Sequence, residues 1–435
     1  MKLPEKPPVV DYESGLEVIN DMDAHELLNE VHREYYPWDK VKYLDIPFQY
    51  TKEQFWSALK LKRASESQFV TIGGYLFSFG LPINIQKGLH EFDIKYGASI
   101  GSTGTFNSAD TQQYLISSIM EEAITSSQIE GAITSRKVAK EMLLQNRTPK
   151  NKSEKMIRNN YLTIQKIREM KDKPLTKERL LEVQKLMTSE TLDNPEDEGR
   201  FRTDNEVRVV DSTDGTVMHQ PPPMEELDTL MDDICIFFNE DKEAQFIHPI
   251  IKACILHFLI GFIHPFVDGN GRTARALFYW YMLKKGYWLT EYLSISAAIL
   301  KSKVAYGKAY LYTETDDLDL TYFLTYKMKV IHTAYESLQK YLERKMKEKE
   351  AAALFMHKGG INERQAQILQ WVGEEPSKII LVKEVETAFG VANETARKDL
   401  RALVVLKLLE SKRVNKQKEV FVRRADFDKQ IKALK

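Results

Sequence analysis

Cysteine is scarce in this 435-residue chain, which contains Cys235 and Cys254 and no others. Both lie in apolar stretches that favour helices. Because disulfides persist mainly in oxidising compartments, we expect two buried free thiols in a reducing environment rather than a disulfide between them.

Long hydrophobic runs are also missing. The longest, from Ala253 to Ile263, is interrupted by His257 and is shorter than the roughly 20 residues that cross a bilayer. The first residues, Met1 to Pro8, lack the apolar core of a signal peptide. We therefore expect a soluble, cytoplasmic protein without membrane contact.

The chain has no dominant charge, since 62 basic and 63 acidic residues give a formal net charge of −1. This balance argues against a chain that binds polyanions along its whole length, but it leaves a local basic patch open. Walker A, protein-kinase and His-Glu-x-x-His zinc motifs are absent as well, so other nucleotide and metal enzyme classes have little support. The length allows two or three domains with a sizeable core.

What is present is a stretch from Ile263 to Arg275, Ile-His-Pro-Phe-Val-Asp-Gly-Asn-Gly-Arg-Thr-Ala-Arg. His264 can take a proton from a hydroxyl near neutral pH. Asp268 offers the carboxylate oxygens that Mg²⁺ prefers when the ion is shared with phosphates. Each piece alone is most often structural, as a His-Pro after an apolar helix or a tight Asp-Gly turn. Their conjunction points to chemistry.

The second half of the stretch has the properties of an anion site. Gly269-Asn270-Gly271 is a turn with little side-chain bulk, and a helix that starts after it would aim backbone N–H groups at an anion. Arg272 and Arg275 lie three apart, so on a helix they share a face and can grip phosphate oxygens. Together with a base and a metal ligand, these residues predict transfer of a phosphorus-centred group from a nucleotide to a hydroxyl.

The stretch resembles, at nine fixed positions around three variable ones, the signature His-Pro-Phe-x-Asp-Gly-Asn-Gly-Arg-x-x-Arg of the Fic (filamentation induced by cAMP) family. The resemblance covers roughly residues 110 to 345. It implies a mainly α-helical bundle with a β-hairpin flap. It also implies that AMP is transferred from ATP, with Mg²⁺, to a Ser, Thr or Tyr hydroxyl of a target protein, with His264 as the base and Asp268 as the metal ligand.

The same resemblance assigns the remaining positions of the signature. Asn270 and the backbone N–H groups of Gly269 and Gly271 would hold the phosphates and stabilise the transition-state charge. Arg272 and Arg275 would contact the outer phosphates. Since every fixed position matches, nothing in the signature indicates an inactive site.

An earlier helix, expected over residues 108–131, ends in Ser126-Ser127-Gln128-Ile129-Glu130-Gly131. Ser126 and Glu130 lie four apart and so share a face. Alone, this run describes an ordinary surface helix end. Beside the signature, it resembles the inhibitory motif Ser/Thr-x-x-x-Glu-Gly/Asn of self-inhibited family members. We therefore expect the Glu130 carboxylate to pair with Arg275 and to misalign bound ATP.

Two further features have competing interpretations. The segment 207–218 contains β-prone runs around a Thr213-Asp214-Gly215 turn, which predict a hairpin. It resembles the flap on which target proteins dock, and the alternative is a plain connecting hairpin. Tyr306 resembles an aromatic residue near the adenine pocket, and the alternative is a packed helical tyrosine.

The last 75 residues resemble a winged helix. Helical patterns near Ile368 and Lys383 precede a third helix within 391–403, and a hairpin is expected through Asn415-Lys416. Ten basic and three acidic residues lie between positions 397 and 424. The segment 391–424 could therefore contact DNA, with Thr395, Lys398 and Arg401 on the groove-entering face. A winged helix used for protein contacts is the alternative.

We therefore predict a region 1–107 of unassigned role, a Fic domain 108–345 and a winged-helix domain 361–435. The expected activity is that of a protein adenylyltransferase autoinhibited by Glu130. A Fic enzyme that uses another donor or removes AMP is one alternative, and a DNA-binding regulator with a nucleotide-sensing Fic domain is another. Family members often form dimers, so a homodimer is a further expectation, whereas the target protein cannot be read from the sequence.

Overall fold

The computed structural model describes residues 2–47, 49–97, 108–211, 213–240, 246–413 and 419–433. These residues are mostly helical, and the strands they contain form three small antiparallel sheets. The expected fold class, a mainly α bundle with a hairpin followed by a small α+β unit, is confirmed.

The N-terminal unit is helical and has a core of its own, which includes Val18, Leu28 and Trp56. The α4 helix starts as its sequence predicts, because Thr51 and Gln54 form a reciprocal capping box. The helices of this unit are α1 (Tyr12–Asn20), α2 (Met22–Glu34), α3 (Trp38–Val41) and α4 (Lys52–Ser65).

A hairpin and a helix connect this unit to the main body. Strands β1 (Gln68–Ile72) and β2 (Tyr75–Phe79) pair in register around Gly73-Gly74, and α5 (Ile83–Gly97) follows. A β-carbon on Gly73 would lie 2.3 Å from the Leu230 side chain, so the turn needs glycine there. Phe77, Phe79 and Phe92 belong to the main core. By packing, this hairpin and α5 therefore belong to the main body, while the predicted domain boundary at residue 107 stays a prediction.

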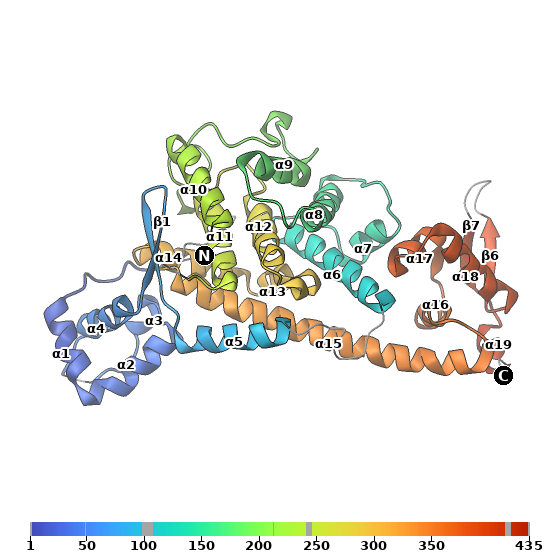
Figure 1. Ribbon diagram of the computed structural model, residues 1–435, viewed down its shortest axis with the longest axis horizontal. Coiled ribbons are helices and arrows are strands. Elements are labelled where there is room, and N and C mark those ends of the chain that lie inside the picture. The colour runs from blue at the N-terminus through green and yellow to red at the C-terminus, as the bar shows by residue number, and fades with distance from the viewer. Residues whose placement is uncertain are drawn as a thin grey trace.

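The main body is a helical bundle around α11 and α12, with the remaining helices packed outside them (Figure 1). Its helices are α6 (Ser108–Ile129), α7 (Arg136–Leu144), α8 (Lys152–Glu169), α9 (Lys177–Thr188), α10 (Leu227–Asn239), α11 (Pro249–Ile263), α12 (Asn270–Lys284), α13 (Ile295–Lys301) and α14 (Lys303–Thr315). Short 3₁₀ helices at Pro195–Asp197, Met224–Glu226 and Trp288–Tyr292 lie in the connections.

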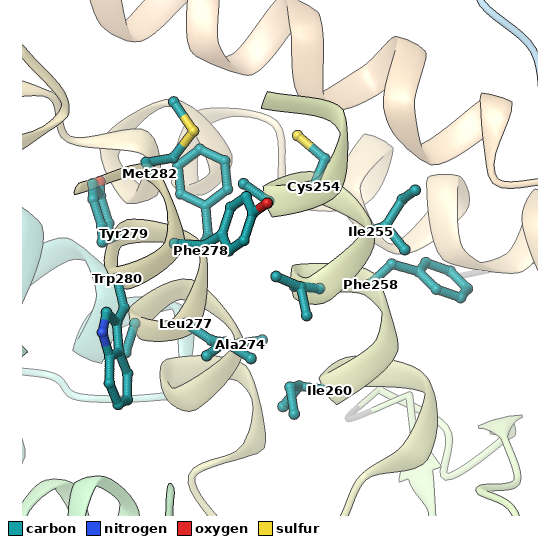
Figure 2. Close-up of a cluster of buried hydrophobic side chains, with 14 of the residues drawn as sticks. Cys254, Ile255, Phe258, Ile260, Ala274, Leu277, Phe278, Tyr279, Trp280 and Met282 are labelled. Carbon is teal, nitrogen blue, oxygen red and sulfur yellow. The ribbon is translucent and has the colours of Figure 1, made fainter. Parts of the chain in front are cut away.

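The α11–α12 pair is the platform of the bundle. Both helices are buried along almost their whole length, and α11 is apolar on all sides, as expected for a helix that is covered on every face. Side chains such as Ile260, Ala274 and Leu277 fill the space between them (Figure 2). Burial of each Leu, Ile or Phe side chain stabilises the fold by roughly 1.5–3 kcal/mol. The loop that joins the two helices is therefore anchored at both ends in a stable core.

The predicted flap is a short hairpin of β3 (Val209–Val210) and β4 (Val217–His219), with a register irregularity between its first two residues. The Val210 and Val217 side chains are exposed. This confirms the expected hairpin, while its use as a docking flap stays a prediction.

A single long helix, α15 (Thr321–Gly359), runs from the bundle to the C-terminal unit (Figure 1). That unit consists of α16 (Glu363–Glu374), β5 (Ile379–Leu381), α17 (Val382–Phe389), α18 (Asn393–Val405), β6 (Leu409–Arg413), β7 (Glu419–Arg423) and α19 (Phe427–Ala433). Its antiparallel sheet has the order β5-β7-β6, and the expected turn at Asn415-Lys416 lies outside the described residues. Helix α17 packs against α6 and α7, so the C-terminal unit contacts the bundle as well as following it.

Both cysteines are free thiols, as expected. Cys254 is buried, and burial raises its pKa to about 12. Cys235 is only partly buried, which corrects the expectation of two buried thiols, and burial raises its pKa to about 11. In the part of the chain that the structure describes, no helix is long and apolar enough to cross a membrane.

Candidate active site

His264 ends α11 in a left-handed backbone conformation, with φ of 47°. Its Nδ1 lies 2.7 Å from the Gly261 carbonyl oxygen. Because a carbonyl can only accept, the proton of the neutral ring sits on Nδ1 and the lone pair on Nε2. Burial lowers the pKa of His264 below its usual value, so the ring is held in the neutral form that a base requires.

The loop after His264 is held by the Asn270 side chain. Its Oδ1 accepts from the Phe266 N–H at 2.9 Å, and its Nδ2 donates to the Phe266 carbonyl at 2.7 Å. Both ends of this buried amide therefore help to close the loop. One hydrogen of the Asn270 amide has no such role, and its contact with a phosphate stays a prediction.

Gly269 makes the sharp bend that starts α12. Its φ is 87°, and a β-carbon there would lie 2.9 Å from the Thr188 side chain. A larger residue would have to strain the backbone and displace α9. The first helical residue is Asn270, two positions before the expected start at Arg272, so the backbone N–H groups of the glycine turn belong to the first turn of the helix.

Asp268 stands at the edge of this turn with its side chain 49% exposed. One carboxylate oxygen accepts from the Gly269 N–H, and the other lies 3.5 Å from Nη2 of Arg272. An exposed carboxylate beside a phosphate-sized anion site suits Mg²⁺, which is commonly held by one or two carboxylates together with substrate phosphates.

Arg272 and Arg275 are almost fully buried. Arg275 donates from Nε to Ser126 Oγ at 2.8 Å, and from Nη2 to the Ser126 carbonyl at 3.0 Å. Arg272 donates from Nη1 to the Met187 carbonyl at 3.2 Å. Among the described residues, Arg272 Nε and Nη2 and Arg275 Nη1 have no hydrogen-bond acceptor. Buried guanidinium donors without acceptors are costly, and an anion bound at this place would satisfy them.

Glu130 follows α6 directly, and its Oε1 accepts from Nη2 of Arg275 at 2.8 Å. The ion pair expected from the sequence is therefore present, on a side chain that is 28% exposed. Partial burial opposes ionisation, but the positive charge of Arg275 keeps the pKa of Glu130 below its usual value. The carboxylate is charged at neutral pH.

The Glu130 carboxylate also lies over the first turn of α12. A β-carbon on Gly271 would stand 2.2 Å from Glu130 Oε1, so this approach requires glycine. A helix N-terminus with two buried arginines is a site for an anion, and an internal carboxylate occupies it. The bound Glu130 carboxylate thus shows that the first turn of α12 and its two arginines accommodate anionic oxygens.

Tyr306 lies in α14, and its hydroxyl is 2.9 Å from Nε2 of His257. Nδ1 of His257 is 3.2 Å from Nζ of the fully buried Lys327, whose pKa burial lowers to about 8. His257 is therefore a packed, hydrogen-bonded residue of the bundle. The contacts of Tyr306 are those of a packed helical tyrosine, and a place beside adenine stays a prediction.

Three residues that support the site had no role assigned from the sequence. Arg202 donates from Nε to the His264 carbonyl at 3.0 Å, and Gln184 donates to the Asp268 carbonyl at 3.2 Å. The His219 ring centroid lies 6.4 Å from that of His264. The sequence around Arg202, Gln184 and His219 contains no motif, so no local pattern could have identified these roles.

Comparisons with known proteins agree with the motifs. Residues 174–282 match the model of the Fic/DOC family, and residues 364–412 match that of the DeoR-like helix-turn-helix domain. The chain thus contains a Fic/DOC domain followed by a helix-turn-helix domain, which confirms both resemblances. The matched segments are shorter than the predicted domains 108–345 and 361–435, whose bounds stay predictions.

Curated relatives share the Fic region. The chain is 36% identical over 97 residues to protein adenylyltransferase Fic of Nematostella vectensis, which is 22% of this chain and 20% of that protein. It is 39% identical over 69 residues to the protein of the same name from Aedes aegypti, 16% and 14% of the two chains. The chain therefore matches a fifth or less of the length of these relatives.

Solved structures with a similar arrangement include a Fic family protein from Desulfovibrio desulfuricans G20, with 18% identity, a TM-score of 0.48, and coverage of 79% of this chain and 95% of that one. A second is Fic-1 from C. elegans, residues 134–508, with 18% identity, a TM-score of 0.47, and coverage of 77% and 86%.

Proposed function

We propose that the chain transfers AMP from ATP to a hydroxyl-bearing side chain of a target protein, and that Glu130 inhibits this transfer from within the same chain. One observation carries the proposal: the Glu130 carboxylate lies against the N-terminus of α12 and Arg275, where an anion would bind. The loop that leads into α12 begins at His264, whose ring is neutral. The names of the curated relatives support the same reaction.

In the proposed reaction, Nε2 of His264 takes the proton of the target hydroxyl. The hydroxyl oxygen bonds to the α-phosphorus of ATP, the bond from that phosphorus to the bridging oxygen breaks, and pyrophosphate leaves. Arg272, Arg275 and the N–H groups of the α12 first turn hold phosphate oxygens and stabilise the charge that develops. Asp268 would hold Mg²⁺, which neutralises phosphate charge when bound.

Glu130 blocks this arrangement by charge and by space. Its carboxylate takes a donor of Arg275 and places a negative charge where an outer phosphate would lie. ATP that binds beside it is displaced from in-line geometry, and a displacement of about 1 Å costs on the order of 10²-fold in rate. Inhibition therefore needs no second protein.

Labelled ATP provides the test. We expect Glu130→Gly to raise auto-AMPylation by about 10²-fold, and His264→Ala in the same background to abolish it. Equal labelling of wild type and Glu130→Gly across Mg²⁺ concentrations would remove the inhibitory role. Labelling that persists without His264 would remove the base.

The donor and the direction of the reaction are separate questions. GTP, UTP, CTP and CDP-choline should be assayed beside ATP with the released variant, and AMPylated product should be returned to wild type to detect removal of AMP. Preferential use of a donor other than ATP, or net loss of AMP from the product, would replace the proposed transfer by another Fic reaction.

A regulator that binds DNA is the second candidate, and the helix-turn-helix match favours it. Lys398 and Arg401 of α18 are exposed, so both could reach a phosphate. Arg397 and Arg401 also lie 3.4 and 3.6 Å from the Glu419 carboxylate, which partly neutralises their charge. Since α17 packs on α6, which bears Ser126, a DNA-bound C-terminal unit would touch the inhibitory helix. Duplex binding by the full chain that weakens with salt would support this candidate, and unchanged binding by Lys398→Ala with Arg401→Ala would contradict it.

A further inference from the structure

His219, the last residue of the flap strand β4, is held between two acceptors. Its Nδ1 lies 2.7 Å from Glu314 Oε2 on α14, and its Nε2 lies 2.6 Å from the Phe262 carbonyl near the end of α11. The ring is 9% exposed. A flap, the base-bearing helix and α14 therefore meet at one imidazole.

This geometry decides the charge of the ring. A carbonyl oxygen accepts only, so Nε2 must carry a proton, and an ionised carboxylate accepts only, so Nδ1 must carry one as well. The histidine is then an imidazolium. The alternative, a protonated Glu314 beside a neutral ring, places the proton on the group that binds it less tightly in water. Burial opposes the charge, but the hydrogen bond and charge of Glu314 raise the pKa of His219.

We propose that His219 is a positioning residue for His264, which as an imidazolium fixes the C-terminal turn of α11 and repels a second proton from the His264 ring 6.4 Å away. The inference rests on the proposed function in that it takes His264 as the base. It assigns to the flap an electrostatic part in the reaction in addition to target docking.

The surroundings of the two rings are compatible with this assignment. Glu314 faces His219, while Glu130 and Arg202 act on His264 from α6 and from the loop before the flap. Only Ile263 lies between Phe262 and His264, so the hydrogen bond from His219 to the Phe262 carbonyl also holds the backbone that presents the base. His219 thus places a positive charge near the His264 ring and, through its hydrogen bond to Phe262, also fixes the position of that ring.

The test uses the full-length chain with ¹⁵N-labelled histidine, so that each ring is titrated without reference to activity. We expect both nitrogens of His219 to show imidazolium shifts at pH 7. In His219→Gln, the titration midpoint of His264 should rise by about one pH unit, because a like charge has been removed. A singly protonated His219 at pH 7, or an unmoved His264 midpoint, would overturn the proposal.

His248→Gln is the matched control, since His248 also pairs with a carboxylate, Asp93 at 2.9 Å, but at the opposite end of α11. It should leave His264 unchanged. If His219→Gln does not fold, Glu314→Gln serves, because losing the carboxylate should lower the midpoint of His219 itself. An unmoved His219 midpoint in that variant would contradict the assigned pairing.

Rates then separate this inference from the proposed function. In the Glu130→Gly background, His219→Gln should shift the acid limb of kcat/KM to higher pH by about one unit, so that transfer falls on the acid side of the profile and stays unchanged near pH 8. A pH-independent loss would indicate a purely structural role and sink the inference. If no AMP transfer occurs in any variant while the ring titrations behave as expected, the proposed function fails and the charge relation between the rings stands.

Discussion

Arg272 and Arg275 lie on one face of α12, and both are almost fully buried, yet their partners differ. Arg275 is bonded to Ser126 and to the Glu130 carboxylate. Arg272 donates to one backbone carbonyl, and its Nη2 lies 3.5 Å from the Asp268 carboxylate in a looser ion pair, but its Nε and Nη2 have no hydrogen-bond acceptor within the described ranges of the chain. Arg275 is therefore paired closely with a carboxylate of the protein, whereas Arg272 keeps buried donors that an anion could satisfy.

Under the proposed function, this difference would separate inhibition from binding. An internal carboxylate that paired with both arginines would exclude the nucleotide, whereas one that pairs with Arg275 alone would let it enter and misplace it. We therefore expect Arg275 to control inhibition and Arg272 to control binding. Variants that alter each arginine or its partner separately test this division.

The largest effect is expected at Arg272. In the Glu130→Gly background, Arg272→Ala should lower kcat/KM for ATP by about 10²–10³-fold, because a buried donor to the reacting phosphates is lost. Labelled-ATP rates measure it, with circular dichroism to check folding. Arg200→Ala, which changes a half-exposed arginine paired with Asp197, is the control. A rate within about twofold of the parent would mean that the Arg272 donors do not face the nucleotide.

A smaller effect is expected from Ser126→Ala in the otherwise unchanged chain. Arg275 loses the acceptor of its Nε, and a charge-assisted hydrogen bond is worth about 1.5–3 kcal/mol, so its grip on Glu130 should loosen and transfer should rise by about tenfold. Ser127→Ala is the matched control, since that hydroxyl bonds to the Ala123 carbonyl inside α6. Equal rates in both variants would show that Ser126 does not contribute to inhibition.

Stability should also distinguish the Glu130–Arg275 pair from an ordinary ion pair. Glu130→Gln leaves a buried guanidinium without its counter-charge and should lower Tm by about a few degrees, and ATP with Mg²⁺ should restore more of it than in wild type. The Glu121–Arg136 pair between α6 and α7 is just as short, at 2.7 Å, but the Arg136 side chain is 64% exposed. Glu121→Gln should therefore change Tm little. An equal fall in Tm in the two variants would show that burial of Arg275 does not make its ion pair more important for stability.

The smallest effect concerns pH. The pKa of Glu130 is lowered in the folded chain, so the ion pair is fully formed above the ordinary glutamate pKa of 4.5 and is lost only as pH falls below it. The ratio of Glu130→Gly to wild-type rates should therefore be constant between about pH 6 and 8.5. A ratio that falls within that window would indicate that another titrating group holds the inhibited state.

Local chemistry made much of this molecule readable in advance. The hairpin around the Thr213-Asp214-Gly215 turn and the helix on each side of the signature loop follow from neighbouring residues. The pairing of Glu130 with Arg275 was also predictable, although 145 residues separate them, because two short motifs identify both partners.

The sequence by itself determined the signature loop, the inhibitory helix end and the helix-turn-helix unit, since each is encoded within a few turns of chain. Tertiary structure alone decided that Arg202, 62 positions from His264, supports its backbone, and that His219, 95 positions from Glu314, pairs with its carboxylate. It also decided that the β1–β2 hairpin joins the main core. A spacing pattern describes which residues share a face, whereas the charge of a buried group depends on what the rest of the chain places next to it.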